Sequence, residues 1–447
     1  MTGLSGDLIV RRGAFVSLSV SDAAHLLRRS GFGATSARIA ELVALGSRER
    51  AVARVMDISL NSSLPIPPFN TDKAGDEKTE LELITQWWLD RMMNAPSPLH
   101  EKLTLFWHGH FATGQGKVND MGLMLNQHQT LRTHAMGRFG DFAQAIAIDP
   151  AMLLYLDNWA NSKVEPQENF GRELLELFTL GSGSYTEADV ISMARAWTGH
   201  SLVDNHRGYV FKPADHDNGN KTLFGITKNW NGPDTIRETL FRARAGESSR
   251  FIVAKLFSFL AYPVTPKDPT VVVLADHFRA SGLNIARLVR EIFLSGEFWS
   301  PMARHALVRS PVEWYVAALQ SSGVTHVPSP KTWMVPSGQV LFDPPSVAGW
   351  RGGRSWISTS GAAVRLQVAS IIRQKLDARV HLSNPSEQGT SAQVIDTALL
   401  QYGITDPSPA TRASLIRWVD ETRARRGDAL APELAVLLLC SPDFQLA

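Results

Sequence analysis

The sequence contains a single cysteine, Cys440, among its 447 residues. A disulfide framework within the chain is therefore impossible, and a cysteine-rich zinc site is excluded. Cys440 lies in the apolar run ELAVLLLCSPDF. This setting predicts a small buried side chain rather than a reactive nucleophile.

The sequence also lacks long apolar runs and an excess of charge of one sign. No stretch approaches the roughly 20 apolar residues that span a bilayer, so no membrane span is expected. The 45 basic and 43 acidic residues leave a net charge of +2, which gives no support to binding of nucleic acid. The first twenty residues do not resemble a signal peptide. The chain as given is therefore expected to be cytoplasmic, or exported if a signal is missing from it.

Common nucleotide-binding and hydrolase motifs are missing as well. The sequence has no P-loop, no H-E-x-x-H or G-x-S-x-G segment, and no G-x-G-x-x-G after a strand. Dinucleotide, P-loop and common hydrolase interpretations therefore lose their usual support. The 44% hydrophobic and 20% charged residues are typical of an ordinary globular protein.

Helical periodicity dominates the chain, while strand patterns are scarce. We therefore predict a mainly α fold, a large multi-helix assembly with two long irregular loops and little or no sheet. Four regions are expected: an N-terminal helical segment (1–60), a proline-rich strap (61–77), a central helical region with polar motifs and a long loop (78–230), and a C-terminal helical region with a Trp/Gly-rich insertion (231–447).

Helix boundaries can be read from local signals. A long helix is predicted from Lys78 to about Asn94, where apolar residues recur on one broad face. Ser21 is a candidate N-cap of the first helix. Thr186 and Asp189 form a variant of the capping box and mark the start of another helix.

Eight of the thirteen histidines lie between His100 and His216, and two of them fall within the motif WHGHF. On a regular helix His108 and His110 would point about 200° apart. They could bind one metal only if the helix ends or loosens at Gly109. The alternative is two separate histidines, one at a helix end and one packed in the core.

The segment ENFGRELLELFTLG places Asn169, Arg172, Glu173 and Glu176 on one helical stripe. Such a stripe can be a solvated face held by an Arg172–Glu176 pair. It can also be a buried carboxylate layer of the kind that helical bundles use for metals or for acid/base chemistry. Both interpretations stay open at this point.

Two glycine-rich segments are candidate binding loops. PADHDNGNKTLFG carries His216, Asp217 and Lys221, which suit an anion-binding or metal-assisted site, or an ordinary polar surface turn. PPSVAGWRGGRSW carries Trp350 and Trp356, which could cover a ligand ring or a sugar face. The alternative is that these tryptophans pin the loop to the core.

Several long motifs together resemble one bacterial family. The segments that carry the resemblance are HLLRRSGFGAT, FWHGHFAT, DPAMLLYLDNWAN, ENFGRELLELFTLG with YTEADVISMARAWTG, HDNGNKTLFG and PPSVAGWRGGRSWI. The chain is similar over nearly its whole length to the family called domain of unknown function eighteen-hundred. The resemblance draws attention to Asp157 and Asn158 besides the residues above.

The resemblance also implies a biological setting. Relatives often carry an export signal and often occur beside a second uncharacterised family that resembles alkaline phosphatases and sulfatases, which is a candidate partner. This chain departs from the family pattern at Gly109 and His200, where relatives tend to have Asn and Trp. Its propensity to bind metal is therefore expected to differ from theirs.

Two functional hypotheses follow. One is a metal-assisted or acid/base hydrolase or transferase acting on a polar or anionic substrate, with a divalent metal as the candidate cofactor. Its candidate residues are, for catalysis, Glu173, Glu176, Arg172, His216 and Asp217; for ligand binding, Lys221, Asn169 and Trp350; and for metal, His108, His110 and Glu173. The other hypothesis is a non-catalytic scaffold that binds the partner protein or an envelope glycan. His100, His128, His134 and His206 carry no support as site residues.

Overall fold

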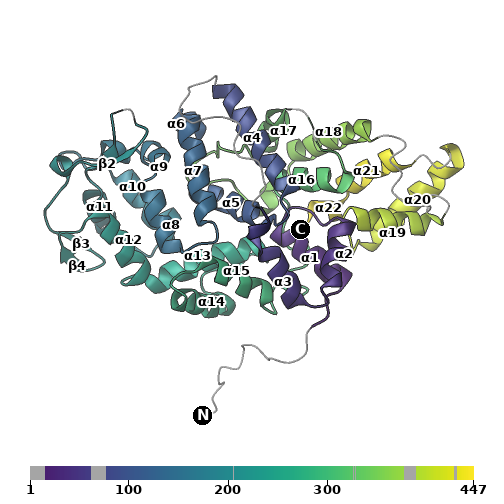
Figure 1. Cartoon of the computed structure of the whole chain (residues 1–447), viewed down its shortest axis with the longest axis horizontal. Coiled ribbons are helices and arrows are strands. Elements are labelled where there is room, and N and C mark those ends of the chain that lie inside the picture. The colour runs from purple at the N-terminus through teal and green to yellow at the C-terminus, as the bar shows by residue number, and fades with distance from the viewer. Residues whose placement is uncertain are drawn as a thin grey trace, which may run out of the picture.

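The computed structural model describes residues 16–61, 77–204, 206–325, 327, 329–376, 389–426 and 430–447. In these ranges 22 helices form an elongated assembly, and the strands form only two short hairpins (Figure 1). The expected mainly α fold is therefore confirmed. Residues 62–76 of the predicted proline-rich strap lie outside the described ranges.

The helices follow one another with short connections through most of the chain. The first eleven are α1 (Val20–Ser30), α2 (Ser36–Ala44), α3 (Arg48–Met56), α4 (Glu77–Asn94), α5 (Leu99–His110), α6 (Gln115–Val118), α7 (Met121–His134), α8 (Phe139–Ala147), α9 (Pro150–Tyr155), α10 (Glu168–Glu173) and α11 (Glu187–Ala196). The others are α12 (Gly232–Phe241), α13 (Ala245–Leu260), α14 (Pro269–Ala280), α15 (Ile285–Leu294), α16 (Pro311–Ser322), α17 (Pro330–Ser337), α18 (Thr359–Lys375), α19 (Ser391–Gln401), α20 (Pro409–Arg426), α21 (Ala431–Cys440) and α22 (Pro442–Gln445).

Two hairpins occupy the segment that the sequence predicted to be an irregular loop. β1 (His200–Leu202) pairs with β2 (Tyr209–Phe211), and β3 (Lys221–Leu223) pairs with β4 (Ile226–Lys228), both antiparallel. β3 packs on α11, whereas β1 contacts α9, and both hairpins lie at one end of the molecule (Figure 1). The long loop is therefore more regular than its Gly, Asn and Asp content suggested.

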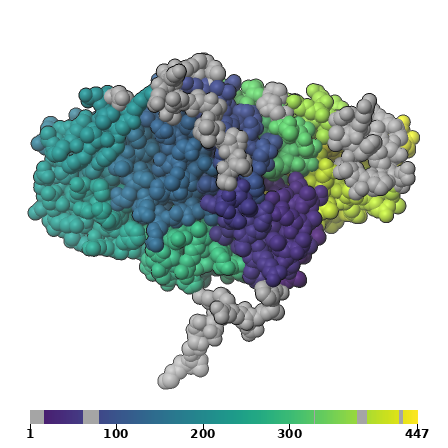
Figure 2. All heavy atoms as spheres, in the orientation of Figure 1, coloured from purple at the N-terminus to yellow at the C-terminus, as the bar shows by residue number. Residues whose placement is uncertain are grey.

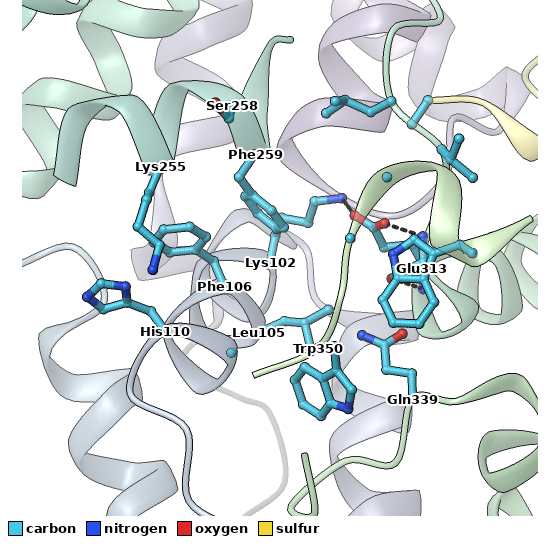
Figure 3. A pocket seen from close by; sticks show the side chains of 18 of the residues that line it. Lys102, Leu105, Phe106, His110, Lys255, Ser258, Phe259, Glu313, Gln339 and Trp350 are labelled. Atoms are coloured by element: carbon cyan, nitrogen blue, oxygen red, sulfur yellow. Dashed lines mark hydrogen bonds and ion pairs between the residues drawn. The ribbon is translucent and has the colours of Figure 1, made fainter. Parts of the chain in front are cut away.

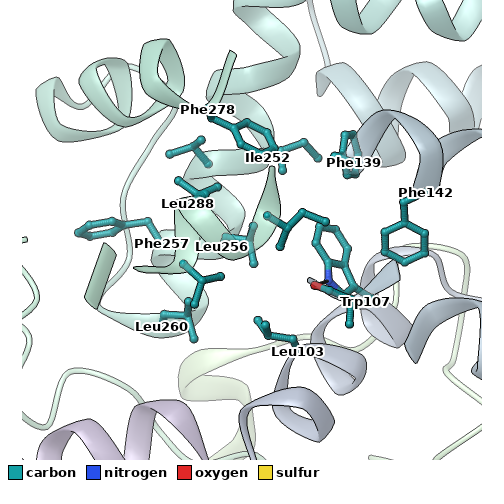
Figure 4. Packing of buried hydrophobic residues seen from close by; sticks show 14 of the residues in the cluster. Leu103, Trp107, Phe139, Phe142, Ile252, Leu256, Phe257, Leu260, Phe278 and Leu288 are labelled. Atoms are coloured by element: carbon teal, nitrogen blue, oxygen red, sulfur yellow. Dashed lines mark hydrogen bonds between the residues drawn. The ribbon is translucent and has the colours of Figure 1, made fainter. Parts of the chain in front are cut away.

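Two apolar clusters form the core. The first gathers residues between Leu18 and Trp299, and the second gathers mainly residues between Ile84 and Phe444. Figure 4 shows the first, in which the rings of Trp107 and Phe142 meet edge to face at 5.2 Å. Each fully buried side chain of this size contributes roughly 1.5–3 kcal/mol to folding.

Helix α5 lies at the junction of the two clusters. Its Leu103 and Trp107 belong to the first cluster, and its Leu105 belongs to the second. On the face that Figure 2 shows, helices α1–α3, in purple, lie between the blue and teal part of the chain and the yellow C-terminal part. The division into four regions stays a prediction, since these clusters draw on residues from several of them.

Most local signals matched the structure. The helix predicted from Lys78 is α4, and Thr186 and Asp189 make the expected capping box. The N-cap prediction at Ser21 was wrong, because Ser19 takes that position. The Ser19 hydroxyl accepts a hydrogen bond from the N–H of the third helical residue, which satisfies a donor that the first helical turn leaves free.

Cys440 is exposed at the end of α21, which corrects the expectation that it is buried. The buried residues of this helix are Leu434, Ala435, Leu438 and Leu439, so Cys440 lies off the buried face. An apolar run in a helix does not bury every member, because only one stripe faces the core. None of the described helices combines the length and apolar character needed to cross a membrane.

Candidate functional site

The two histidines of WHGHF lie on opposite sides of α5. The helix stays regular to its end at His110, so no loosening at Gly109 brings the two imidazoles together. His108 faces the second cluster, where its Nε2 accepts a hydrogen bond of 2.9 Å from the N–H of Phe342. Burial lowers the pKa of His108 to about 3. The side chain is therefore a neutral imidazole that holds a loop in place.

His110 faces the first cluster and makes different contacts. Its Nε2 lies 3.1 Å from the carbonyl oxygen of Phe178, to which it donates. Its Nδ1 is buried and has no hydrogen-bond partner within the described residues. Burial, together with the nearby Lys255, holds the pKa of His110 well below its usual value.

The predicted metal ligands are not assembled as a set. Within the described residues, no group of three or more His, Cys, Asp or Glu side chains is arranged to hold a metal ion. His108 and His110 point apart, and each uses one ring nitrogen in a hydrogen bond to the backbone. The geometry therefore does not bring His108, His110 and Glu173 around one ion.

Gly109 has a different role from the one that chelation required. A Cβ atom at Gly109 would lie 3.5 Å from the ring of Trp350. A Cβ atom at Gly349 would lie only 2.2 Å from the Gly109 carbonyl oxygen. The two glycines let the loop that carries Trp350 lie directly against α5, as expected if its tryptophan pins the loop to the core.

The predicted polar stripe is divided among several partners. Helix α10 continues as a π-helical segment from Leu174 to Leu180, which rotates later residues relative to earlier ones. Arg172 pairs with Glu168 and Glu187, so the Arg172–Glu176 pair considered from the sequence does not form. The amide of Asn169 donates to the carbonyl oxygen of Leu156 at 3.3 Å.

The two glutamates of this stripe differ in their surroundings. Glu176 accepts hydrogen bonds from the hydroxyls of Tyr185 at 2.6 Å and Ser182 at 3.1 Å. Glu173 is half-buried, and burial together with the neighbouring Glu176 raises the pKa of its carboxyl. Within the described residues no metal site is assembled around Glu173.

The glycine-rich loop motif is held by its own internal contacts. Lys221 is buried and donates to Asn229 at 3.1 Å, to the Trp230 carbonyl at 2.9 Å and to the carbonyl of Asp217. Asp217 accepts from Arg195 at 2.6 Å, and the Nδ1 of His216 donates to the carbonyl of Thr198 at 2.8 Å. These groups all serve the packing of the hairpins on α11.

Asp157 and Asn158, to which the family resemblance draws attention, lie in different environments. Asn158 is fully buried and donates to the carbonyl oxygens of Trp197 and His200. Asp157 is on the surface, where it forms an ion pair of 2.7 Å with Lys117. His110 bonds to the backbone of Phe178 in the second motif, but the polar side chains of the three motifs have separate partners and do not converge on one centre.

A cavity of about 500 Å³ lies at the junction of the two clusters. Its wall is built from one face of α5, from α13, from the Trp350 loop, and from the segment that leads into α16 (Figure 3). Residues 348–356 therefore contribute to a pocket as well as packing on α5. His110 lines this cavity, whereas His108 does not.

Basic side chains outnumber acidic ones in this cavity. The basic side chains that line it are Arg29, Lys102 and Lys255, against a single carboxylate side chain, that of Glu313. Glu313 is already bonded to Lys102 and to the N–H of Ser310, as the dashed lines in Figure 3 show. The negative charge of Glu313 is therefore already compensated by Lys102.

Arg29 is only partly satisfied by hydrogen bonds. It is 1% exposed, and only its Nη2 is bonded, to the carbonyl oxygen of Ala303 at 2.6 Å. Its Nε and Nη1 have no partner within the described residues, and burial lowers the pKa of Arg29 to about 9. A buried guanidinium with free donors is costly unless an acceptor reaches it.

Lys255 lies at another part of the wall. Its Nζ lies 5.1 Å from the centre of the Phe251 ring, and no ion pair or hydrogen bond to it is found within the described residues. Burial lowers the pKa of Lys255 to about 8. Phe106, Phe259 and Trp350 supply apolar surface around the same space.

Residues 25–446 match the family model described as protein of unknown function (DUF1800). The chain belongs to this family. Comparison with curated proteins and with solved structures gave no match. The family assignment confirms the resemblance seen in the motifs, and it assigns no activity to the DUF1800 fold.

Sequence reasoning missed the basic residues of the cavity. The signal for Lys255 is a single lysine inside the apolar helical run RFIVAKLFSFL, and the signal for Arg29 is the pair of arginines in HLLRRSGF. A charged residue on an otherwise apolar helical face either reaches solvent or, if it is buried, usually has a partner. Nothing in the sequence showed that these two helices of a DUF1800 protein converge on one pocket.

Proposed function

We propose that the cavity binds a small organic anion with an apolar group, and that Lys255 and His110 act on it as an acid–base pair. The observation that carries the proposal is the surplus of buried basic side chains around an apolar-walled space. The proposal keeps acid/base chemistry on an anionic substrate, as expected from the sequence, but assigns it to the cavity and not to the Glu173 stripe or the His216 loop.

The cavity is lined by more basic than acidic side chains. Three basic side chains face one carboxylate, and that carboxylate is already bonded to Lys102. A buried charge without a partner costs several kcal/mol, so a bound anion that accepts from Arg29 would recover part of that cost. Carboxylate, phosphate and sulfate groups share the required acceptor chemistry.

Shape and polarity are the second argument. Apart from its few charged groups, the cavity is walled by aromatic and aliphatic side chains such as Phe106, Phe259 and Trp350. Ligand pockets in this size range commonly combine apolar walls with a few polar groups that orient the ligand. The ligand class that fits is an anion attached to an aromatic or aliphatic body.

Proton chemistry is the third argument. With a pKa of about 8, Lys255 exists in both protonation states near neutral pH. His110 is neutral, because burial and the nearby Lys255 hold its pKa well below the usual value, so its unpartnered Nδ1 is a weak base that can relay a proton but not retain it. Groups with pKa values near the working pH make efficient general acids and bases.

The binding test uses 3-phenylpropionate as the probe, with calorimetry on the full chain. We expect saturable binding that weakens about tenfold in Lys255→Met, since one charge-assisted contact contributes about 1.4 kcal/mol or more. Lys267→Met is the matched control, because Lys267 is exposed and lies outside the cavity. The uncharged analogue 3-phenylpropan-1-ol should bind much more weakly than the acid.

Two results would contradict the proposal. One is that the wild type fails to bind the acid. The other is that the acid and the alcohol bind equally and that Lys255→Met changes neither, which would mean that charge has no role.

The earlier hypotheses that concern other residues stay predictions. They are catalysis by Glu173, Glu176, Arg172, His216 or Asp217, ligand binding by Lys221 or Asn169, and scaffolding of a phosphatase-like companion or an envelope glycan. Trp350 enters the present proposal as part of the cavity wall. Divalent-metal chemistry at His108, His110 and Glu173 has no assembled ligand set to support it in the part of the chain that the structure describes.

A further inference from the structure

We infer that Lys255 forms an imine with an aldehyde or ketone carbonyl carried by the anionic ligand. The inference rests on the proposed function of the cavity and adds the reactive group of its substrate class, an oxo acid or a carbonyl compound with another anionic group.

The position of the amine is the starting observation. Lys102 and Lys221, the two fully buried lysines of the described residues, are both held by bonds to oxygen atoms. Lys255 differs, because its Nζ lies near an aromatic ring with no bonded oxygen among the described residues. A lysine held in this way keeps its nitrogen available to a ligand.

The surroundings favour the neutral amine, which is the form that attacks a carbonyl. Burial lowers the pKa of Lys255 to about 8, and among the described residues no carboxylate is paired with it to reverse that effect. At pH 8 about half of such an amine is neutral, against about one in 250 for an ordinary lysine. The apolar walls also limit the water that would hydrolyse an imine.

Three other basic groups line the same cavity. Figure 3 shows His110 beside Lys255, with Lys102 and Glu313 further along the pocket. Arg29 lines the same cavity and has two free donors. A ligand whose anionic group accepts from Arg29 would occupy the cavity that Lys255 also lines.

The chemical step balances without an oxidant or a reductant. The lone pair of Nζ attacks the carbonyl carbon, a C–N bond forms, and the π electrons move to oxygen. A proton leaves nitrogen through the free Nδ1 of His110 and returns to that oxygen, which gives a carbinolamine. The C–O bond then breaks, the oxygen leaves as water with the second proton from nitrogen, and the C=N bond forms.

The test uses phenylpyruvate as the carbonyl-bearing probe and 3-phenylpropionate as its analogue without the carbonyl. The full chain is incubated with phenylpyruvate and sodium cyanoborohydride at pH 8, and the labelled peptides are mapped by mass spectrometry. We expect labelling at Lys255 at least about tenfold faster than at the exposed Lys267, following the difference in neutral amine. Excess 3-phenylpropionate should block the reaction at Lys255 and not at Lys267.

Variants provide a second line of evidence. Lys255→Arg keeps the positive charge but has no amine that can form the imine, so it is expected to lose the label. Lys267→Arg should keep the label at Lys255. Circular dichroism checks the fold of each variant, and the blocking experiment on the wild type needs no variant at all.

The outcomes separate the two proposals. If 3-phenylpropionate binds but Lys255 is labelled no faster than surface lysines, the imine inference is overturned and the anion-binding function stands. If neither probe binds the cavity, both are overturned. Labelling at Lys255 that 3-phenylpropionate fails to block would also overturn the inference, because the reaction would then not occur in the ligand site.

Discussion

The imidazole of His108 accepts a hydrogen bond from the backbone N–H of Phe342, a residue 234 positions later in the chain. Both partners are buried, and the Phe342 ring packs against the imidazole with the ring centres 5.5 Å apart. This contact ties α5 to the segment that leads into the Trp350 loop. One wall of the cavity therefore depends on a histidine that does not line it.

Replacement of His108 by alanine should destabilise the fold. The N–H of Phe342 would lose its acceptor in a buried place, which costs about 1–3 kcal/mol, and a cavity would add to the loss. His108→Gln offers an amide oxygen near the position of Nε2 and should lose less. Urea unfolding measures both, with the half-exposed His134→Ala as control. Equal stability of His108→Ala and wild type would contradict this structural role.

Stability should fall as the solution is acidified below about pH 6.5. Burial lowers the pKa of His108 to about 3 and that of His200 to about 4, and it lowers those of His110 and His128 well below 6.5. In this range the unfolded chain binds protons that the folded chain excludes, so each such histidine removes up to about 1.4 kcal/mol per pH unit. Asp149 has the opposite effect, because burial raises its pKa to about 7 and the folded chain then binds a proton that the unfolded chain does not. It offsets the contribution of about one histidine.

Urea unfolding between about pH 6.5 and pH 4.5 measures this slope. The variant His108→Gln should show a shallower dependence, since it removes one group that titrates only in the unfolded chain. A stability that rises on acidification, or an unchanged slope in His108→Gln, would show that the buried histidines do not govern this pH range.

Gly349→Ala should disrupt the contact between the Trp350 loop and α5. The backbone of Gly349 has a φ of +74°, and a Cβ there would lie 2.2 Å from the Gly109 carbonyl oxygen. Overpacking and the left-handed conformation together should cost about 2 kcal/mol or more. Gly352→Ala is a matched control in the same loop, since a Cβ there meets nothing within 4 Å. Thermal melting should separate the two variants, and equal melting temperatures would be inconsistent with the close approach.

Lys221→Met should unfold or loosen the hairpins on α11. The ammonium donates to three oxygen atoms, and its loss leaves the buried carbonyl of Trp230 unpaired, at a cost of about 1–3 kcal/mol. Hydrogen exchange of residues 200–230 measures the local effect. Lys163→Met, at an exposed position, is the control. Faster ligand release without faster exchange would instead favour the binding role that the family motif suggested.

Metal content should not depend on His108 or Glu173. The two side chains share no ligand group within the described residues, and His108 Nε2 is occupied by the N–H of Phe342. Elemental analysis of purified wild type, His108→Gln and Glu173→Gln should therefore give the same values. Stoichiometric metal in the wild type that is lost in both variants would restore the metal hypothesis.

The sequence by itself determined the mainly α fold, the family and many helix boundaries. These are local properties: the capping box at Thr186 needs only Asp189 three residues later, and the apolar stripe of α4 repeats within a few turns. Motif recognition is local as well, because each segment of the family pattern is a short continuous run. Such features require no knowledge of what packs on them.

Only the tertiary structure decided which polar residues meet. His108 and His110 are neighbours in the sequence, yet α5 points them into different clusters, where each is neutralised by burial. Arg29 and Lys255 are 226 positions apart, yet they line one cavity. The physical reason is that burial and the arrival of distant charges set the protonation state and available partners of a side chain, and both depend on how the helices pack.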